Sequence, residues 1–190
     1  MNGKDDNLAP EFSVKVSLDS IGDEPREYEI KASEDERAAL STRFGLVSIG
    51  EFSAKLVLSW LKPGKVLSVR GRISATVTQS CVISLDPVPA DVDEEFDVVF
   101  SRYPDETADV IDPHEAELLE GEEVDIGEIV SEELSLSLNP YPRRPDIDPA
   151  SVNLGPGARL LSEEAADQDA RKSAKKDNPF EVLAALKPKN

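Results

Sequence analysis

Residues 52–85 read FSAKLVLSWLKPGKVLSVRGRISATVTQSCVISL. Apolar and polar side chains alternate on both sides of Lys62-Pro63-Gly64-Lys65, which is the pattern of half-buried strands. Proline fixes φ at the first corner of this turn and glycine accepts a positive φ at the second, so a type II turn is favoured. The stretch therefore predicts a long β-hairpin. Gly71 interrupts the apolar face, which indicates a bulge or a close approach of another segment.

Further strands are predicted on both sides of the hairpin. Residues 12–18 place Phe12, Val14, Val16 and Leu18 at every second position, and residues 26–31 repeat the pattern more weakly. After Asp86-Pro87-Val88-Pro89, a strand over 92–100 follows. Because short turns join antiparallel neighbours, at least three antiparallel strands should form the centre of the sheet.

Helix boundary signals occur at three places. Ser33 and Glu36 have the capping-box spacing ahead of a helix at about 34–44, which Gly45 should end. The stretch Asp125-Ile126-Gly127-Glu128 caps a second helix that stops at Asn139-Pro140, and its glycine allows a close backbone approach. Near the end of the sequence, Asn178-Pro179 is a good start for a short amphipathic helix.

These elements predict an α+β fold. We expect an antiparallel β-sheet, or a partly closed barrel-like sheet, with two packed helices and a short C-terminal helix on a flexible linker. The expected organisation is a flexible tail at 1–11, a single domain at 12–141 with an acidic loop at about 101–122, a mostly disordered linker at 142–177, and the terminal helix at 178–187.

The charge is large and unevenly distributed. The 190 residues carry 21 Lys and Arg against 39 Asp and Glu, a net charge of −18. Residues 52–85 hold five basic and no acidic residues, whereas residues 86–133 hold 19 acidic residues and one basic residue, Arg102. A polyanion of this size repels phosphate backbones, which excludes simple non-specific nucleic-acid binding by the chain as a whole. Its acidic surplus attracts cationic partners.

Two interpretations of the basic hairpin remain open at this point. Arg70 and Arg72 lie on the polar face of their strand and could contact phosphate directly. Alternatively, the acidic residues of the strand at 92–100 pair with these bases across the sheet.

Signals for catalysis, metal or cofactor binding are missing from the sequence. One cysteine, Cys81, and one histidine, His114, leave no set of zinc ligands, and no nucleotide-binding or hydrolase motif occurs. Cys81 falls on an apolar face and is expected to be buried, whereas His114 is expected in a solvated loop. We therefore expect no enzymatic activity, no cofactor and no metal.

The first residues, MNGKDDNLAP, contain no basic and apolar leader, and no stretch approaches the roughly 18 apolar residues of a membrane span. The expected compartment is the cytoplasm, or an organelle matrix, without a membrane partner.

Three collinear stretches resemble a known family. They are VTQSCVISLDPV at 77–88, EEVDIGEIVSEELSLSLNPYP at 122–142 and NPFEVLAALK at 178–187. Together they are similar to the YceD family of bacterial large ribosomal RNA subunit accumulation proteins, which has plastid relatives. The resemblance implies a role in accumulation or maturation of large-subunit ribosomal RNA, without an established catalytic activity. Members are often encoded beside a small basic large-subunit ribosomal protein.

The chain departs from one family pattern. Many members carry a C-x-R-C stretch, where this sequence has Ile83 in place of the arginine and Ser84 in place of the second cysteine. Only Cys81 remains, which argues against a zinc or redox role.

The leading hypothesis is a non-catalytic ribosome biogenesis factor that binds a basic large-subunit ribosomal protein or an assembly factor. Its terminal helix would lie in a groove of the partner, or alternatively on its own domain. The partner-binding candidates are Asn178, Pro179, Phe180, Val182, Leu183 and Leu186. The alternative is direct binding of ribosomal RNA, for which the candidates are Lys55, Lys62, Lys65, Arg70, Arg72, Arg143 and Arg144.

Overall fold

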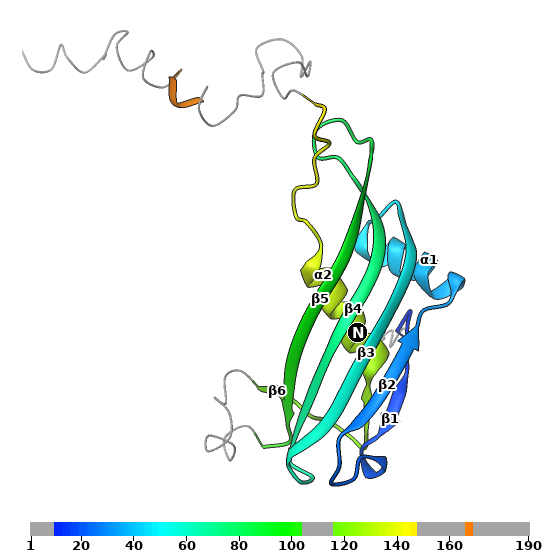
Figure 1. Cartoon of the computed structure of the whole chain (residues 1–190), viewed down its shortest axis with the longest axis vertical. Helices are drawn as coiled ribbons and strands as arrows, with labels where there is room; N and C mark the ends of the chain where they lie inside the picture. The colour runs from blue at the N-terminus through cyan, green and yellow to red at the C-terminus, as the bar shows by residue number, and fades with distance from the viewer. Residues whose placement is uncertain (1–9, 104–115, 148–165, 169–190) are drawn as a thin grey trace, which may run out of the picture.

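The computed structural model describes residues 10–103, 116–147 and 166–168 of the chain. Its main feature is a five-stranded sheet with the order β2-β3-β4-β5-β6 (Figure 1). A separate pair of short strands, β1 and β7, completes the β-structure. The bounds are β1 (Lys15–Ser17), β2 (Arg26–Lys31), β3 (Ser48–Lys62), β4 (Val66–Ser80), β5 (Pro87–Ser101), β6 (Ala116–Leu118) and β7 (Glu123–Asp125).

The predicted hairpin is confirmed as β3 and β4. Gly64 has φ +67° in the turn, and the backbone N–H of Lys65 donates to the carbonyl of Lys62 over 2.9 Å. Gly71 is a point of close approach, since a Cβ there would lie 2.7 Å from the carbonyl oxygen of Lys55 and 2.8 Å from the ring of Phe96. Only glycine lets the strands keep this arrangement.

The expected antiparallel or barrel-like sheet is wrong in three respects. β6 pairs with β5 in parallel, so the sheet is mixed. Its edges, β2 and β6, do not pair with each other, so the sheet is open, and β1 pairs with β7 outside it. β6 and β7 have three residues each, too few to give a period-two pattern in the sequence. The parallel pairing also requires the long connection between β5 and β6, which falls in the predicted acidic loop.

The first predicted helix is confirmed as α1 (Glu34–Phe44). The Ser33 side chain accepts from the backbone N–H of Glu36, and the Glu36 carboxylate accepts from the backbone N–H of Ser33. Gly45 ends the helix in the left-handed region with φ +65°. This helix therefore has the capping box and C-cap that the sequence indicates.

The second predicted helix is confirmed as α2 (Ile126–Ser137). The Asp125 carboxylate accepts from the backbone N–H groups of Gly127 and Glu128, and also from that of Val14 over 2.8 Å. A Cβ on Gly127 would lie 2.7 Å from the carbonyl oxygen of Phe12. Asp125 and Gly127 thus dock the start of α2 onto the segment that leads into β1.

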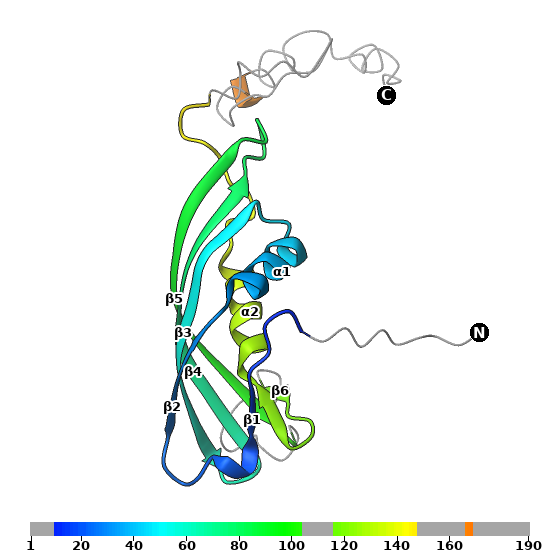
Figure 2. The ribbon, with the colours of Figure 1, turned by 90° about the vertical axis from the view of Figure 1, so that its right-hand side faces the viewer.

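The core lies on one side of the five-stranded sheet. Figure 2 shows α1, α2 and β1 on the same side, together with the short 3-10 helix η1 (Leu18–Ser20) beyond β1. The opposite face, called the outer face below, carries no described helix or strand. The largest fully buried side chains are Phe52, Leu40, Leu56, Leu58, Leu67, Ile73, Ile126, Leu134, Val66, Val69 and Val130.

Candidate interaction surface

Charged side chains form rows across the outer face. The strand register places Glu29, Lys55, Arg72 and Glu95 side by side on β2, β3, β4 and β5. The neighbouring row contains Glu27, Val57, Arg70 and Asp97. A hollow of about 950 Å³ lies between these side chains, over Gly71. The basic residues of the hairpin are therefore flanked by acidic residues on both sides.

Arg72 is bound to the acidic residues of β5. Its guanidinium donates to Asp93 from Nε to Oδ1 over 2.5 Å and from Nη2 to Oδ2 over 2.9 Å, and it reaches Glu95 over 3.4 Å. The hydrogen bond and the charge of Arg72 lower the pKa of the Asp93 carboxyl below its usual value. Pairing across the sheet, one of the two interpretations of the basic hairpin, is thus confirmed for Arg72.

The other basic candidates of the hairpin are spread over its length. Lys55 lies 4.0 Å from Glu29, and the ammonium of Lys65 lies 5.7 Å from the ring centroid of Tyr103. Lys62 is the last residue of β3. Arg70 is exposed and makes no ion pair with any residue that the structure describes. Direct RNA binding by these residues stays a prediction.

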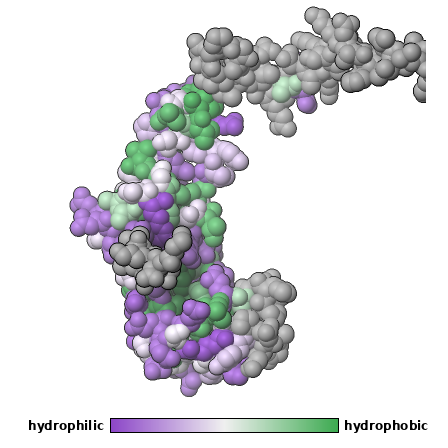
Figure 3. Space-filling view, turned by 180° about the vertical axis from the view of Figure 1, so that it is seen from behind, coloured by the Kyte–Doolittle hydropathy of each residue, from purple (hydrophilic) through white to green (hydrophobic). Residues whose placement is uncertain are grey.

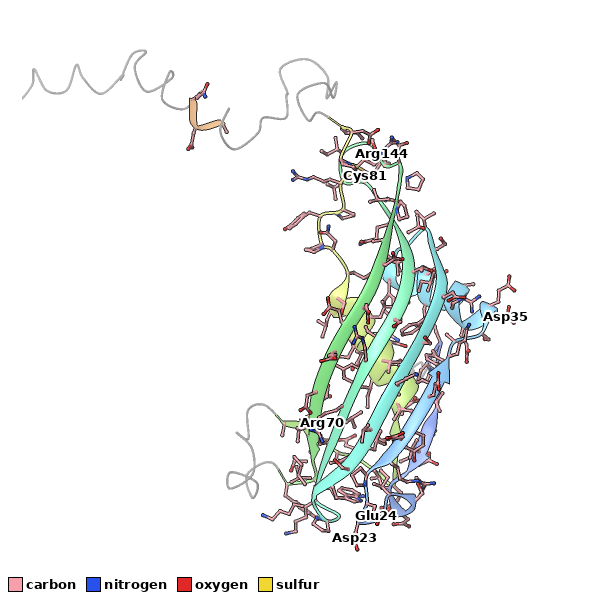
Figure 4. The ribbon with its side chains drawn as sticks, viewed as in Figure 1. Asp23, Glu24, Asp35, Arg70, Cys81 and Arg144 are labelled. Carbon is pink, nitrogen blue, oxygen red and sulfur yellow. The ribbon has the colours of Figure 1, made fainter. Side chains whose placement is uncertain are left out.

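The tip of the β4–β5 hairpin is a second cluster. The backbone N–H of Val82 donates to the carbonyl of Pro142 over 2.9 Å, and Arg144 Nη1 donates to Asp86 Oδ2 over 3.1 Å. Arg144 also pairs with Asp146. Figure 4 shows Arg144 beside Cys81 at this end of the molecule, far from Arg70.

Cys81 is buried, as the sequence predicts, and its thiol is free. Backbone N–H groups, that of Ser84 first and then that of Arg144, lower the pKa of the Cys81 thiol to about 7. The thiol has no exposed surface even though it lies at the narrow tip. The contact between this tip and Pro142 joins residues about sixty positions apart, and no local pattern in the sequence predicts it.

The tip exposes two apolar side chains and one arginine to solvent. Leu85 is 77% exposed and Val82 is 48% exposed, and Figure 3 shows hydrophobic residues gathered at this end. Arg143 is also exposed and has no ion pair within the described ranges.

Acidic side chains gather on β5. The acidic residues at alternate positions share the outer face and are all exposed. Arg72 neutralises part of this charge, and Ser68 donates a long hydrogen bond of 3.4 Å to Asp97. The four residues, called the β5 acidic row below, are Asp91, Asp93, Glu95 and Asp97.

The predicted terminal helix and its residues Asn178, Pro179, Phe180, Val182, Leu183 and Leu186 lie outside the described residues, as does His114. Their roles stay predictions.

Comparison with known families settles the relationship of the chain. The model of the family described as "Large ribosomal RNA subunit accumulation protein YceD" matches residues 69–187. The chain belongs to the YceD family. The match includes all three stretches on which the resemblance rests, and it begins within β4. The YceD description links the family to accumulation of the large ribosomal RNA subunit. No curated protein and no solved structure matches the chain.

Neither a helix able to span a membrane nor a group of side chains able to hold a metal ion occurs among the described residues. None of the helices in this part of the chain is both long and apolar enough to cross a membrane. Within the same residues, no group of three or more His, Cys, Asp or Glu side chains is arranged to hold a metal ion.

Proposed function

We propose that this protein supports the accumulation or maturation of large-subunit ribosomal RNA by binding a basic ribosomal protein or assembly factor, without catalysing a reaction. Membership of the YceD family supports the ribosomal context. The observation that carries the proposed partner class is the β5 acidic row, four exposed carboxylates on one strand of a chain with a net charge of −18. The proposed place of action is the cytoplasm, where ribosomal subunits assemble.

The physical benefit of such binding is protection of a polycation. A basic ribosomal protein that is not yet assembled is attracted to any polyanion, because this attraction depends on charge rather than sequence. An acidic surface that covers part of the basic protein lowers its attraction to the wrong RNA. Release then requires only that the correct ribosomal RNA site bind more tightly.

Direct RNA binding is the second candidate. Arg70 and Arg143 support it, since both are exposed and neither makes an ion pair within the described residues. Against it, Lys55, Arg72 and Arg144 each have a carboxylate within 4.0 Å. An RNA phosphate would have to displace these carboxylates.

A binding experiment with two probes separates the candidates. The full chain is immobilised and offered either the proteins stripped from large ribosomal subunits or deproteinised large-subunit ribosomal RNA, at about 50 mM and about 200 mM salt. We expect selective retention of one or a few basic proteins and no retention of RNA. Retention of RNA that falls steeply with salt, without retention of proteins, would contradict the proposal and favour the alternative.

A further inference from the structure

β5 has a long edge that no described strand covers. The strand has 15 residues and pairs with β4 from Pro87 to Ser101. On its other side, β6 pairs only with residues 99–101. Within the described part of the chain, residues 87–98 make no backbone hydrogen bond on that side. An uncovered edge of this kind offers a row of backbone donors and acceptors to another strand.

The hydrogen bonds at the two ends of β5 show which residues point to this edge. The carbonyl of Ser101 accepts from the N–H of Leu119, so Ser101 points toward the β6 side. The N–H of Arg102 donates to Lys65, and at the other end the carbonyl of Asp86 accepts from Cys81, so both point toward β4. Backbone direction alternates along a strand, and the β4–β5 register has no shift. The backbone N–H and carbonyl groups of the odd-numbered residues of β5 therefore point to the free edge.

The two prolines of β5 agree with this assignment. Pro87 and Pro89 are both odd-numbered, so their backbone nitrogens face the free edge. The missing N–H groups of these prolines therefore cost no hydrogen bond with β4. Asp91 is the first residue after these prolines with a backbone N–H that points to the free edge. The other odd-numbered residues up to Asp97 follow it in the same orientation. This window of seven residues matches the usual length of a strand.

The residues with free backbone groups are the same four residues that form the β5 acidic row. A strand added to this edge would meet carboxylates at alternate positions on the outer face. On the core side of β5, Phe96 and Val98 are half-buried and Glu94 is exposed. A second copy of the same edge would place like charges opposite one another, which is destabilising. The charge therefore favours a basic occupant and disfavours self-pairing.

We propose that the free edge of β5 from Asp91 to Asp97 binds an extended basic segment of the partner by strand addition. The segment carries Lys or Arg at alternate positions toward the acidic row, and apolar residues between them cover Phe96 and Val98. This inference rests on the proposed function and specifies how the basic partner is bound. Backbone hydrogen bonds provide the affinity, and the alternating side chains select the partner.

The other edge of the sheet serves as an internal comparison. β2 has six residues, REYEIK, in which basic and acidic side chains are mixed. The N–H of Ala32 donates to Phe52, so Ala32 points toward β3 and Glu29 points outward. A proline at Glu29 would remove an outward donor from an edge that lacks an acidic row.

The test separates backbone pairing from charge attraction. Glu95→Pro removes an outward N–H, whereas Glu95→Gln removes the same charge and keeps the N–H. Asp91→Pro is a second variant in case Glu95→Pro fails to fold, and Glu29→Pro is the control on the other edge. One probe is a synthetic peptide of about nine residues with Lys alternating with Val or Thr, together with its version N-methylated at alternate residues. The other probe is the protein mixture stripped from large ribosomal subunits.

We expect Glu95→Pro to bind the unmethylated peptide roughly three- to tenfold more weakly than Glu95→Gln, the effect of losing one hydrogen bond. Glu29→Pro should bind like the wild type, and the N-methylated peptide should not bind. Equal binding by Glu95→Pro and Glu95→Gln, or equal binding of both peptides, would overturn strand addition. If strand addition fails while the wild type still retains basic ribosomal proteins, the proposed function stands. Loss of that retention as well would contradict both.

Discussion

Arg72 on β4 holds Asp93 on β5 through two hydrogen bonds, one from Nε to Oδ1 over 2.5 Å and one from Nη2 to Oδ2 over 2.9 Å. This pair lies where the basic hairpin meets the β5 acidic row. Arg72 thus affects both candidate functions, but it changes the affinity for the ligand in opposite directions. As a phosphate ligand it would aid RNA binding, whereas as a partner of Asp93 it weakens the field that attracts a basic protein.

Arg72→Ala therefore distinguishes the two candidate functions. Removing this cation leaves the β5 acidic row more negative, so we expect two- to threefold tighter binding of stripped large-subunit proteins at low salt, roughly the effect of one exposed charge pair. Affinity is measured by titration of the immobilised full chain. Arg26→Ala, on β2 at the other edge, serves as the control and should leave affinity unchanged. Weaker binding of ribosomal RNA by Arg72→Ala would instead support direct RNA contact.

Gly71→Ala should destabilise the fold. Its Cβ would lie 2.7 Å from the carbonyl oxygen of Lys55 and 2.8 Å from the ring of Phe96. Overpacking of this kind reduces the free energy of unfolding by about 1–3 kcal/mol. Urea denaturation measures the change. Gly22→Ala is the matched control, because nothing lies within 4 Å of its added Cβ, and an equal loss in both variants would refute the close-approach explanation.

Two acidic side chains in the middle of α2, Glu132 and Glu133, make stability depend on pH. Desolvation by burial is the largest cause that raises the pKa of Glu132 and of Glu133. The charges of Glu128 and Glu117 raise the pKa of Glu132 further, and those of Glu117 and Glu132 raise the pKa of Glu133 further. A carboxyl whose pKa is higher in the folded state binds a proton more tightly there. Its contribution to stability is therefore fully present below the unfolded-state pKa and is lost as pH rises through the folded-state pKa.

We expect the double variant Glu132→Gln/Glu133→Gln to be more stable than the wild type at pH 7 by about 0.5 kcal/mol, the scale of exposed charge interactions. This difference should shrink as the pH falls through the folded-state pKa values. Thermal unfolding from pH 4 to pH 7 measures it, with Glu24→Gln in an exposed turn as the control. A stability difference between variant and wild type that grows as the pH falls would contradict the raised pKa values of these two carboxyls.

The C-terminal segment provides a further test. If residues 178–187 form a helix that lies in a groove of the partner, Phe180→Ala with Leu183→Ala should impair large-subunit assembly and leave thermal unfolding of the isolated chain unchanged. A lower unfolding temperature would instead indicate that the helix packs on its own domain. Glu181→Gln is the control within the same segment. Normal assembly with the double variant would exclude the partner-bound helix.

The elements predicted well are those fixed by neighbouring residues. The capping box of Ser33 and Glu36, the turn at Gly64 and the cap at Asp125 each act within a few positions, so a local pattern is sufficient. The close approach at Gly71 is also visible in the sequence because it interrupts an alternating face. The caps and the turn follow from local backbone geometry, whereas the close approach at Gly71 involves Lys55 and Phe96 on the neighbouring strands.

The features that were missed depend on pairing over long distances. β6 and β7 are too short to produce a pattern, and their partners lie in β5 and in the distant β1. Sequence alone shows that β5 is acidic, but it does not show that one side of the strand is uncovered. That property depends on where β6 begins, because its first residue, Ala116, pairs with Val99 and leaves the preceding residues of β5 without a described partner strand on that side.

Accumulation of large-subunit ribosomal RNA in cells that lack the native protein tests the central claim most directly. One strain carries Asp91→Asn, Glu95→Gln and Asp97→Asn, which neutralise most of the β5 acidic row and keep the Asp93 contact with Arg72. The matched strain carries Asp23→Asn, Glu24→Gln and Asp35→Asn, which remove the same charge away from β5 (Figure 4). The ratio of mature large-subunit to small-subunit RNA should be restored in the matched strain and stay low in the first. Equal restoration in both strains would contradict the role assigned to the β5 acidic row.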